Sequence, residues 1–170
     1  DLQIQDLLKN DYGLILNNIA FLLSNSDATR KAAINTANSA IVHWKKIGNE
    51  LGLGKGYRVQ GICYHQTDHS KQAFEAFQKA LDIFEPLNLK DEIAPILSWR
   101  GTQYHNIGRN EEAKRDLIRS LEIGPKHFKA MTLNRLGRVY MHQLKWDAAQ
   151  AHLEPLLHFA KEIPDYKYWP

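Results

Sequence analysis

The sequence predicts an all-α protein made of about four helix–turn–helix hairpins stacked as a solenoid. Three observations favour this class. Gly-x-x-Tyr followed nine residues later by Ala occurs three times, in copies that start at Gly61, Gly101 and Gly137. The apolar residues after the first two copies recur at helical spacing, and no segment alternates β-branched and polar residues over a useful length. Repetition at this period indicates stacked supersecondary units.

The first hairpin is expected at residues 13–50, where Ala20 takes the place of the later glycines. Its second helix is predicted by small residues that stand 40 positions before their counterparts in the next hairpin, namely Ala33, Ala37 and Ala40. Residues 1–12 are interpreted as a linker or the end of a preceding helix. Because the chain opens on Asp1, we expect it to be a fragment of a longer protein.

The second hairpin is expected at 54–87, with helices at 54–66 and 70–86. In AFEAFQKALDIF the apolar residues follow i, i+3, i+4, i+7 and i+8, which predicts a helix with one buried face. Asp68 or Ser70 is expected to cap this helix after the turn QTDHS. The stretch GLGKGY, residues 52–57, is interpreted as a helix end and turn, since it has neither Walker spacing nor a preceding strand.

The third hairpin is expected at 91–125, with helices at 91–106 and 110–123 and with Gly108 ending the first of them. The fourth is expected at 127–163, with helices at 127–142 and 146–161. Pro155 falls inside the last helix. It predicts a kink or an early break, because a proline in a helix interior costs about 3 kcal/mol.

These helix pairs resemble the tetratricopeptide repeat (TPR). The residues that carry the resemblance are Gly61, Tyr64, Ala73, Phe77 and Ala80; Gly101, Tyr104, Ala113, Leu117 and Pro125; and Gly137, Tyr140, Ala149, Leu153 and Leu156. The pattern departs from the family at its tryptophan position, which holds Tyr57, Leu97 and Leu133, and in a period of 40 where 34 is usual. The resemblance covers about residues 13–163 of a single domain, 1–170, and implies a right-handed TPR-like solenoid.

The resemblance also implies how the helices pack. The small residues let the two helices of a hairpin approach closely, and the tyrosines fill the space between adjacent repeats. The longer loops, such as KKIGNELGLGKGY, are similar to those in the TPR regions of bacterial STAND-type signal-transduction ATPases and related regulators.

In this family a concave groove is lined mainly by the first helix of each hairpin. Carried onto this sequence, the ligand-binding candidates are Asn17, Phe21, Lys55, Arg58, Ile62, His65, Ser98, Thr102, His105, Asn134, Arg138 and Met141. The lining is polar and mildly basic and contains no Asp or Glu. Such a surface suits the amides and carboxylates of an extended peptide. The fixed clamp by which chaperone-binding members hold a terminal carboxylate is not expected, since Ile62 and Thr102 replace residues it needs.

Two functions stay open. The first is a non-catalytic protein–protein interaction module that binds a peptide or protein segment in the groove, as the sensor or scaffold part of a larger signalling protein. The second is a structural spacer that packs against other domains of its own chain. The expected partner is a protein or peptide, with no nucleic acid bound directly and no membrane.

Composition agrees with both functions. The hydrophobic fraction is 44%, the charged fraction is 24% and the formal net charge is +3, as in ordinary globular proteins. The 22 basic and 19 acidic residues are spread evenly, which does not favour a nucleic-acid-binding surface. No run of about 18 apolar residues is present, so no membrane span is expected. The single cysteine, Cys63, is typical of a reducing compartment, and we expect a cytoplasmic protein.

No enzyme activity, metal or cofactor is expected. His65 and His69 stand four residues apart, but the turn at Asp68 separates them. Cys63 has no neighbouring base and is expected to be a small buried thiol. The tryptophans at apolar helical positions are expected to pack between repeats rather than stack on bases, and they are Trp44, Trp99 and Trp146.

Overall fold

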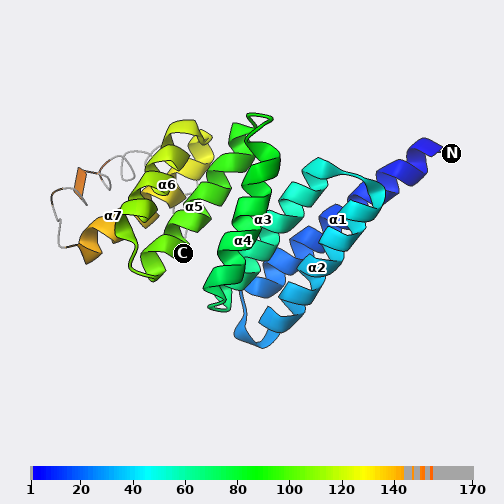
Figure 1. The fold of residues 1–170 in the computed structure, drawn as a ribbon, viewed down its shortest axis with the longest axis horizontal. Helices are drawn as coiled ribbons and strands as arrows, with labels where there is room; N and C mark the ends of the chain where they lie inside the picture. Colours follow the sequence, from blue (N-terminus) through cyan, green and yellow to red (C-terminus); the bar gives the residue numbers. More distant parts are fainter. Residues whose placement is uncertain (1, 144–146, 148–149, 152–153, 155–170) are drawn as a thin grey trace, which may run out of the picture. The chain divides into compact units, whose positions relative to one another are not determined.

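The structure is a computed structural model that describes residues 2–143 together with 147, 150, 151 and 154. Over these residues the chain is helical and contains no strand (Figure 1). The helices are α1 (Leu2–Ser24), η1 (Asp27–Thr29), α2 (Arg30–Ile47), α3 (Glu50–Gln66), α4 (Ser70–Phe84), α5 (Lys90–Asn106), α6 (Asn110–Ile123) and α7 (Lys126–His142). The predicted all-α class is confirmed.

The chain divides into two compact units, residues 1–92 and 93–170, with the boundary in the first turn of α5. In the first unit α1 pairs with α2 and α3 pairs with α4, and α3 also packs along both α1 and α2. The two hairpins of this unit are therefore stacked. In the second unit α6 packs along α7. Antiparallel helices joined by short turns are thus the building block throughout the described residues (Figure 1).

Two glycines adopt the left-handed conformation that ends a helix. Gly48 follows α2 with φ 68°, and the next N–H, of Asn49, donates to the carbonyl of Trp44 at 3.1 Å. Gly108 follows α5 with φ 78°, as the sequence predicts. Asn49 then begins α3, because its side-chain Oδ1 accepts the Gly52 N–H at 2.8 Å.

The glycine-rich stretch 52–57 lies inside α3, so its interpretation as a helix end and turn is wrong. The cap at Asn49 starts the helix before these residues, and tertiary packing outweighs their weak helix propensity. The capping prediction for α4 is also wrong. His69 is the N-cap residue, its side chain makes no capping bond, and Asp68 occupies a turn position with φ 58°. Residues 2–12 belong to α1, which continues without a break into the first hairpin.

The signature glycines lie where two helices of a hairpin touch. A Cβ on Gly61 of α3 would stand 2.5 Å from ring atoms of Phe77 on α4. A Cβ on Gly101 of α5 would stand 2.8 Å from Cγ of Leu117 on α6. A side chain at either position would therefore force its neighbours to shift, and the predicted close approach of the helices is confirmed.

Trp44 joins the three helices α1, α2 and α3. Its indole is 4% exposed and lies against Gly13 of α1 and Gly52 of α3, and a Cβ on either glycine would overlap the ring. Three alanines on the same helix are fully buried, namely Ala33, Ala37 and Ala40. The expectation that Trp44 packs between repeats is confirmed.

Two of the signature tyrosines also pack as expected. Tyr104 of α5 and Tyr140 of α7 lie against a buried cluster from α6 and α7, made of Ala113, Leu117, Leu136 and Val139. Each ring faces a cation: Arg109 lies 4.9 Å from the centroid of Tyr104, and Lys114 lies 5.8 Å from that of Tyr140. The tyrosines therefore tie neighbouring helices of the second unit together.

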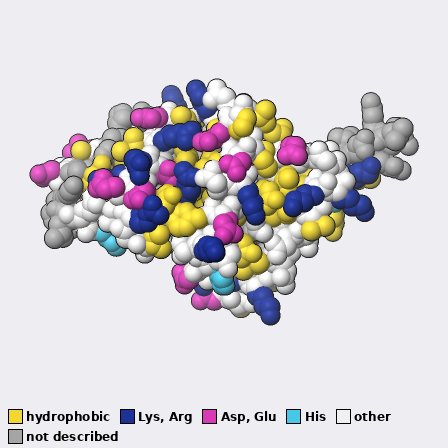
Figure 2. Space-filling model, viewed as in Figure 1, with side chains coloured by type: hydrophobic (Ala, Val, Ile, Leu, Met, Phe, Trp, Pro, Cys, Tyr) yellow, Lys and Arg dark blue, Asp and Glu magenta, His cyan; other side chains and the backbone are white. Residues whose placement is uncertain are grey.

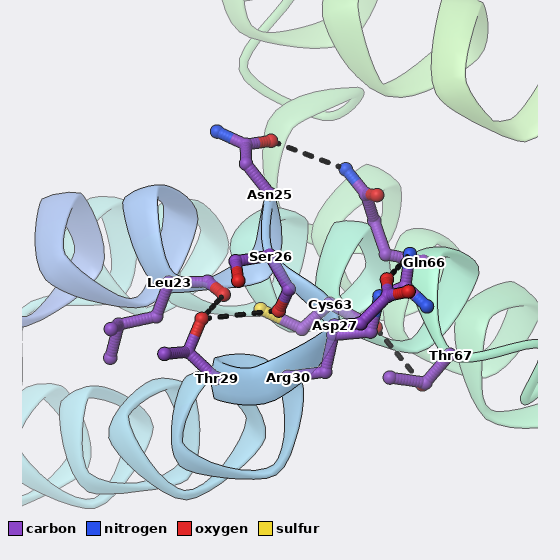
Figure 3. A network of polar contacts seen from close by, with 9 residues as sticks. All are labelled: Leu23, Asn25, Ser26, Asp27, Thr29, Arg30, Cys63, Gln66 and Thr67. Atoms are coloured by element: carbon purple, nitrogen blue, oxygen red, sulfur yellow. Dashed lines mark hydrogen bonds and ion pairs between the residues drawn. The ribbon is translucent and has the colours of Figure 1, made fainter.

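A hydrogen-bonded turn joins α1 to α2 (Figure 3). The Thr29 hydroxyl donates to the Leu23 carbonyl at 2.6 Å, and Arg30 pairs with Asp27 at 2.7 Å. Gln66, at the end of α3, donates to the Asn25 side chain at 3.5 Å (Figure 3). The ends of α1 and α3 therefore meet at one edge of the first unit.

The predicted last helix, 146–161, falls largely outside the described residues, of which 147, 150, 151 and 154 are helical. The break predicted at Pro155 and the packing predicted for Trp146 lie outside them as well. Among the described helices, none is both long enough and apolar enough to cross a membrane.

Candidate functional site

All of the candidate residues lie on α1, α3, α5 and α7, the first helices of their hairpins. Their exposure divides them into two groups. Five are buried, with at most 9% of the side chain exposed: Asn17, Ile62, Ser98, Thr102 and His105. The others are exposed or half-buried, namely Phe21, Lys55, Arg58, His65, Asn134, Arg138 and Met141. Contact with a partner through the second group needs no rearrangement of the helices.

Asn17 is the most unusual of the buried candidates. The residue is 3% exposed, and neither Oδ1 nor Nδ2 has a hydrogen-bond partner among the residues that the structure describes. A Cβ on Gly56 of α3 would stand 3.7 Å from its Oδ1, so the side chain points toward the next hairpin. A buried polar group without a partner costs stability.

On α3 the two cationic candidates share one acid. The ammonium of Lys55 lies 3.2 Å from Glu92 Oε1, and the guanidinium of Arg58 lies 3.7 Å from Glu92 Oε2. The predicted lining positions of α3 hold no acid, but an acid from α5 lies beside two of them. Glu92 stands 34 residues after Arg58, in the first turn of α5. Its carboxylate offsets part of the basic charge of α3.

On α7, Asn134 and Arg138 stand one turn apart and are both exposed. Neither makes a hydrogen bond or an ion pair with another residue that the structure describes. Residues four apart lie on the same helix face. One face of α7 thus presents a carboxamide and a guanidinium to which no described residue bonds.

Beside them lies Arg135, a residue that the repeat positions did not single out. Its guanidinium stacks on Trp99 with 3.9 Å between Cζ and the ring centroid, and its Nη1 donates to Ser98 Oγ at 2.7 Å. Thr132 in turn donates to the same Ser98 oxygen at 3.1 Å. Burial, and secondarily the nearby charge of Arg138, lowers the pKa of Arg135 to about 10.

Four residues of α5 and α7 line a small hollow: Thr102, His105, Arg135 and Arg138. The Nδ1 atom of His105 lies 2.9 Å from the side-chain oxygen of Asn110, and its ring packs edge-on against His142 at 4.6 Å between centroids. The Thr102 hydroxyl donates to the Ser98 carbonyl at 3.0 Å. The lining contains cationic and neutral polar groups and no carboxylate.

Cys63 is a buried thiol, as predicted. It is 1% exposed, and its Sγ lies 3.7 Å from the Ala20 carbonyl of α1. Burial raises the pKa of this thiol to about 12, so at neutral pH it is not a thiolate nucleophile. Within the described part of the chain, no three His, Cys, Asp or Glu side chains are grouped so that they could hold a metal ion.

No known protein-family profile matches the sequence, and no curated protein matches it. Solved structures do resemble the fold. The apo form of RapI matches with a TM-score of 0.76 and 20% identity over 94% of this chain, which spans 45% of the RapI chain. BtubC from P. vanneervenii matches with a TM-score of 0.72 and 17% identity, over 93% of this chain and 67% of that one.

A third structure identifies the repeat type. The TPR protein TTC0263 from Thermus thermophilus matches with a TM-score of 0.56 and 17% identity, over 93% of this chain and 95% of that one. The predicted TPR-like fold is therefore confirmed. Sequence identities of 17–20% establish a shared fold and do not establish a shared function.

Proposed function

We propose that this chain is a non-catalytic protein-interaction module that binds a peptide or protein segment along the first helices of its hairpins. The observation that carries the proposal is the pair Asn134 and Arg138 on α7. Both side chains are exposed, lie on one helix face and have no partner within the described residues. A carboxamide can bond both the N–H and the C=O of a peptide backbone, and a guanidinium adds several donors.

The TPR-like fold supports the same proposal, because repeat proteins present extended surfaces built from one helix of each unit. The loop resemblance adds that the chain acts as the sensor or scaffold part of a larger bacterial signalling protein. The partner is then a protein or peptide in the cytoplasm.

The test is a selection of random dodecapeptides displayed on phage against the immobilised chain, followed by fluorescence polarisation with each enriched peptide. The variant Asn134→Ala/Arg138→Ala should weaken binding by about tenfold or more, since two groups of hydrogen bonds are lost. Its melting temperature should stay close to that of the wild type, because both side chains are exposed.

Arg115→Ala is the matched control, since this arginine is exposed on α6, the second helix of its hairpin. It should leave peptide binding unchanged. The proposal fails if no peptide is enriched, or if enriched peptides bind the double variant as tightly as the wild type.

The structural spacer remains a second candidate because α1 carries exposed apolar residues. Leu8, Tyr12, Ile15, Ile19 and Leu22 follow the spacing of one helix stripe, and each is at least 42% exposed. Figure 2 shows apolar side chains at the surface of the part of the molecule formed by α1 and α2. Exposed apolar patches mark contacts with other protein surfaces.

Cysteine labelling separates the spacer from the module. Ile15→Cys in the full-length protein should react with a maleimide more slowly than in this chain alone if other domains cover α1. Equal labelling rates would rule out the spacer without touching the peptide-binding proposal.

A further inference from the structure

The first unit contains a cavity of about 600 Å³ where α3 begins and where the turn 85–89 joins α4 to α5. We call it the α4–α5 cavity. Its volume falls in the range of ligand pockets, roughly 300–1,000 Å³. Of the groove candidates, Lys55 alone is among the described residues that line it. The cavity therefore has room for a ligand that the proposed function does not use.

The surface that the α4–α5 cavity presents to solvent is mainly apolar. Leu51 is 45% exposed there, and Leu89 is half-buried. The methylene stem of Lys55 adds to this surface, while Phe84 is fully buried beneath it. Because water gains free energy by leaving apolar surface, an apolar group that covers these side chains is favoured.

The walls of the cavity are fixed before anything binds. In the turn, Asn88 adopts the left-handed conformation with φ 49°, and the N–H of Leu89 donates to the carbonyl of Phe84 at 3.2 Å. At the rim, an ion pair of 3.2 Å between Lys55 and Glu92 joins α3 to α5. A ligand that enters a preformed cavity avoids the free-energy cost of ordering it.

The formal charges around the cavity cancel. Lys55 and Lys90 carry two positive charges, and Asp91 and Glu92 carry two negative ones. A charged ligand would gain no net attraction from such a lining, and it would lose hydration on entering. The lining therefore favours a neutral, apolar group.

The α4–α5 cavity is open to solvent and adjoins a second cavity. This neighbour, of about 490 Å³, shares Leu51, but its surface is mainly polar and its lining includes Asn10, Asn49 and Glu50. Sites for free small molecules enclose most of the ligand surface, which an open cavity does not do. A protein segment fits the pair better, because it can place a side chain in the apolar cavity and its polar backbone along the other.

We propose that the α4–α5 cavity binds one large apolar side chain, Leu, Met or Phe, of a partner protein segment that passes over Leu51. The side chain displaces water from Leu51 and Leu89, and the backbone of the segment lies along the polar neighbouring cavity. This surface goes beyond the proposed function, because its residues belong to the first unit, whereas Asn134 and Arg138 belong to the second.

The direct test is a titration of the chain labelled with ¹³C in its leucine methyl groups. The probes are pentapeptides, acetyl-Gly-Gly-Xaa-Gly-Gly-amide, with Phe, Leu, Ala or Gln at the centre. The Phe and Leu pentapeptides should give saturable shifts at Leu51 and Leu89 and none at Leu22, which is 67% exposed on α1. The Ala and Gln pentapeptides should bind about tenfold more weakly or worse. The proposal is overturned by the absence of saturable shifts, by equal shifts at all three leucines, or by equal binding of the Gln pentapeptide.

A pair of leucine variants locates the binding. Leu51→Gln should weaken binding of the Phe pentapeptide about tenfold, followed at Leu89, because an apolar wall is replaced by a polar one. Leu87→Gln is the matched control, since Leu87 is 55% exposed in the same turn as Leu89 but does not line the cavity. It should leave binding unchanged. Equal weakening by both variants would mean that the pentapeptide binds exposed leucines in general, and the cavity would not be the site.

Benzyl alcohol distinguishes a free molecule from a protein segment. If it saturates Leu51 and Leu89 while the Phe pentapeptide does not, the cavity binds small apolar molecules and the assignment to a side chain is wrong. A failed pentapeptide titration refutes the cavity and leaves the proposal for α7 standing. Displayed peptides that lose binding in Leu51→Gln but keep it in Asn134→Ala/Arg138→Ala would support the cavity and refute the role proposed for α7.

Discussion

Gly61→Ala tests whether the hairpin helices are as close as the structure places them. The added Cβ would stand 2.5 Å from both Cδ1 and Cε1 of Phe77, where ordinary contacts are 3.4–4 Å. The ring of Phe77 is fully buried, so it cannot swing into solvent. The helices would have to separate by about 1 Å or the ring would have to leave its rotamer, and such overpacking costs about 1–3 kcal/mol.

An opposing effect reduces the loss. Alanine in a helix interior is more favourable than glycine by about 0.5–1 kcal/mol. The expected net change is therefore a destabilisation of about 0.5–2 kcal/mol. Urea titration followed by far-UV circular dichroism measures it. A stabilisation of about 1 kcal/mol, as helix propensity alone gives, would refute the close approach of α3 and α4.

Two further variants make the test specific. Gly56→Ala is the matched control on the same helix, because the nearest atom to its Cβ is Cγ1 of Ile41 at 3.1 Å, which needs only a small adjustment. It should be close to neutral. Gly61→Ala combined with Phe77→Leu should cost less than the sum of the single changes, since the smaller side chain relieves the overlap.

Two other predictions concern the first unit. Trp44→Ala should destabilise the protein by about 3–5 kcal/mol in the same urea titration, because a nearly buried indole leaves a cavity between glycines that cannot fill it; a loss below about 1 kcal/mol would contradict the packing. Cys63 should resist a thiol-specific disulfide reagent in the native state and react once the chain is unfolded in urea. Because its folded-state pKa is raised from 9.0 to about 12, the thiol contributes stability below pH 9, and this contribution is lost progressively as the pH rises toward 12. Cys63→Ala should remove that part of the alkaline decline in stability, and an unchanged pH profile would contradict the assignment.

Much of the fold could be predicted from the sequence because its signals are local. The Gly-x-x-Tyr and Ala pattern and the apolar spacing place α5, α6 and α7 within one residue of their observed bounds. The start of α3 was missed for the opposite reason. Its glycines weaken a helix locally, and the reason for them lies on other helices, since Gly52 lies against the ring of Trp44 and Gly54 against that of Phe84.

For the candidate site too, local features could be predicted from the sequence and contacts between distant residues could not. That the candidates lie on first helices followed from the repeat, and the structure places them there. The pairing of Arg58 with Glu92, 34 residues away, and the stacking of Arg135 on Trp99, 36 residues away, depend on how helices meet in space. Neither leaves a periodic signal. The spacing of these pairs by about one repeat is the sole sequence feature that could have suggested them.

The indole of Trp44 also limits which substitutions the sequence can accept during evolution. Since it takes up the space in which Gly13 and Gly52 would carry side chains, the three positions share one volume across three helices. A larger residue at either glycine can be accepted only together with a smaller one at position 44. Residues 13, 44 and 52 are therefore expected to covary among homologues of this chain. An alignment in which they vary independently would mean that α1, α2 and α3 are spaced differently in those homologues.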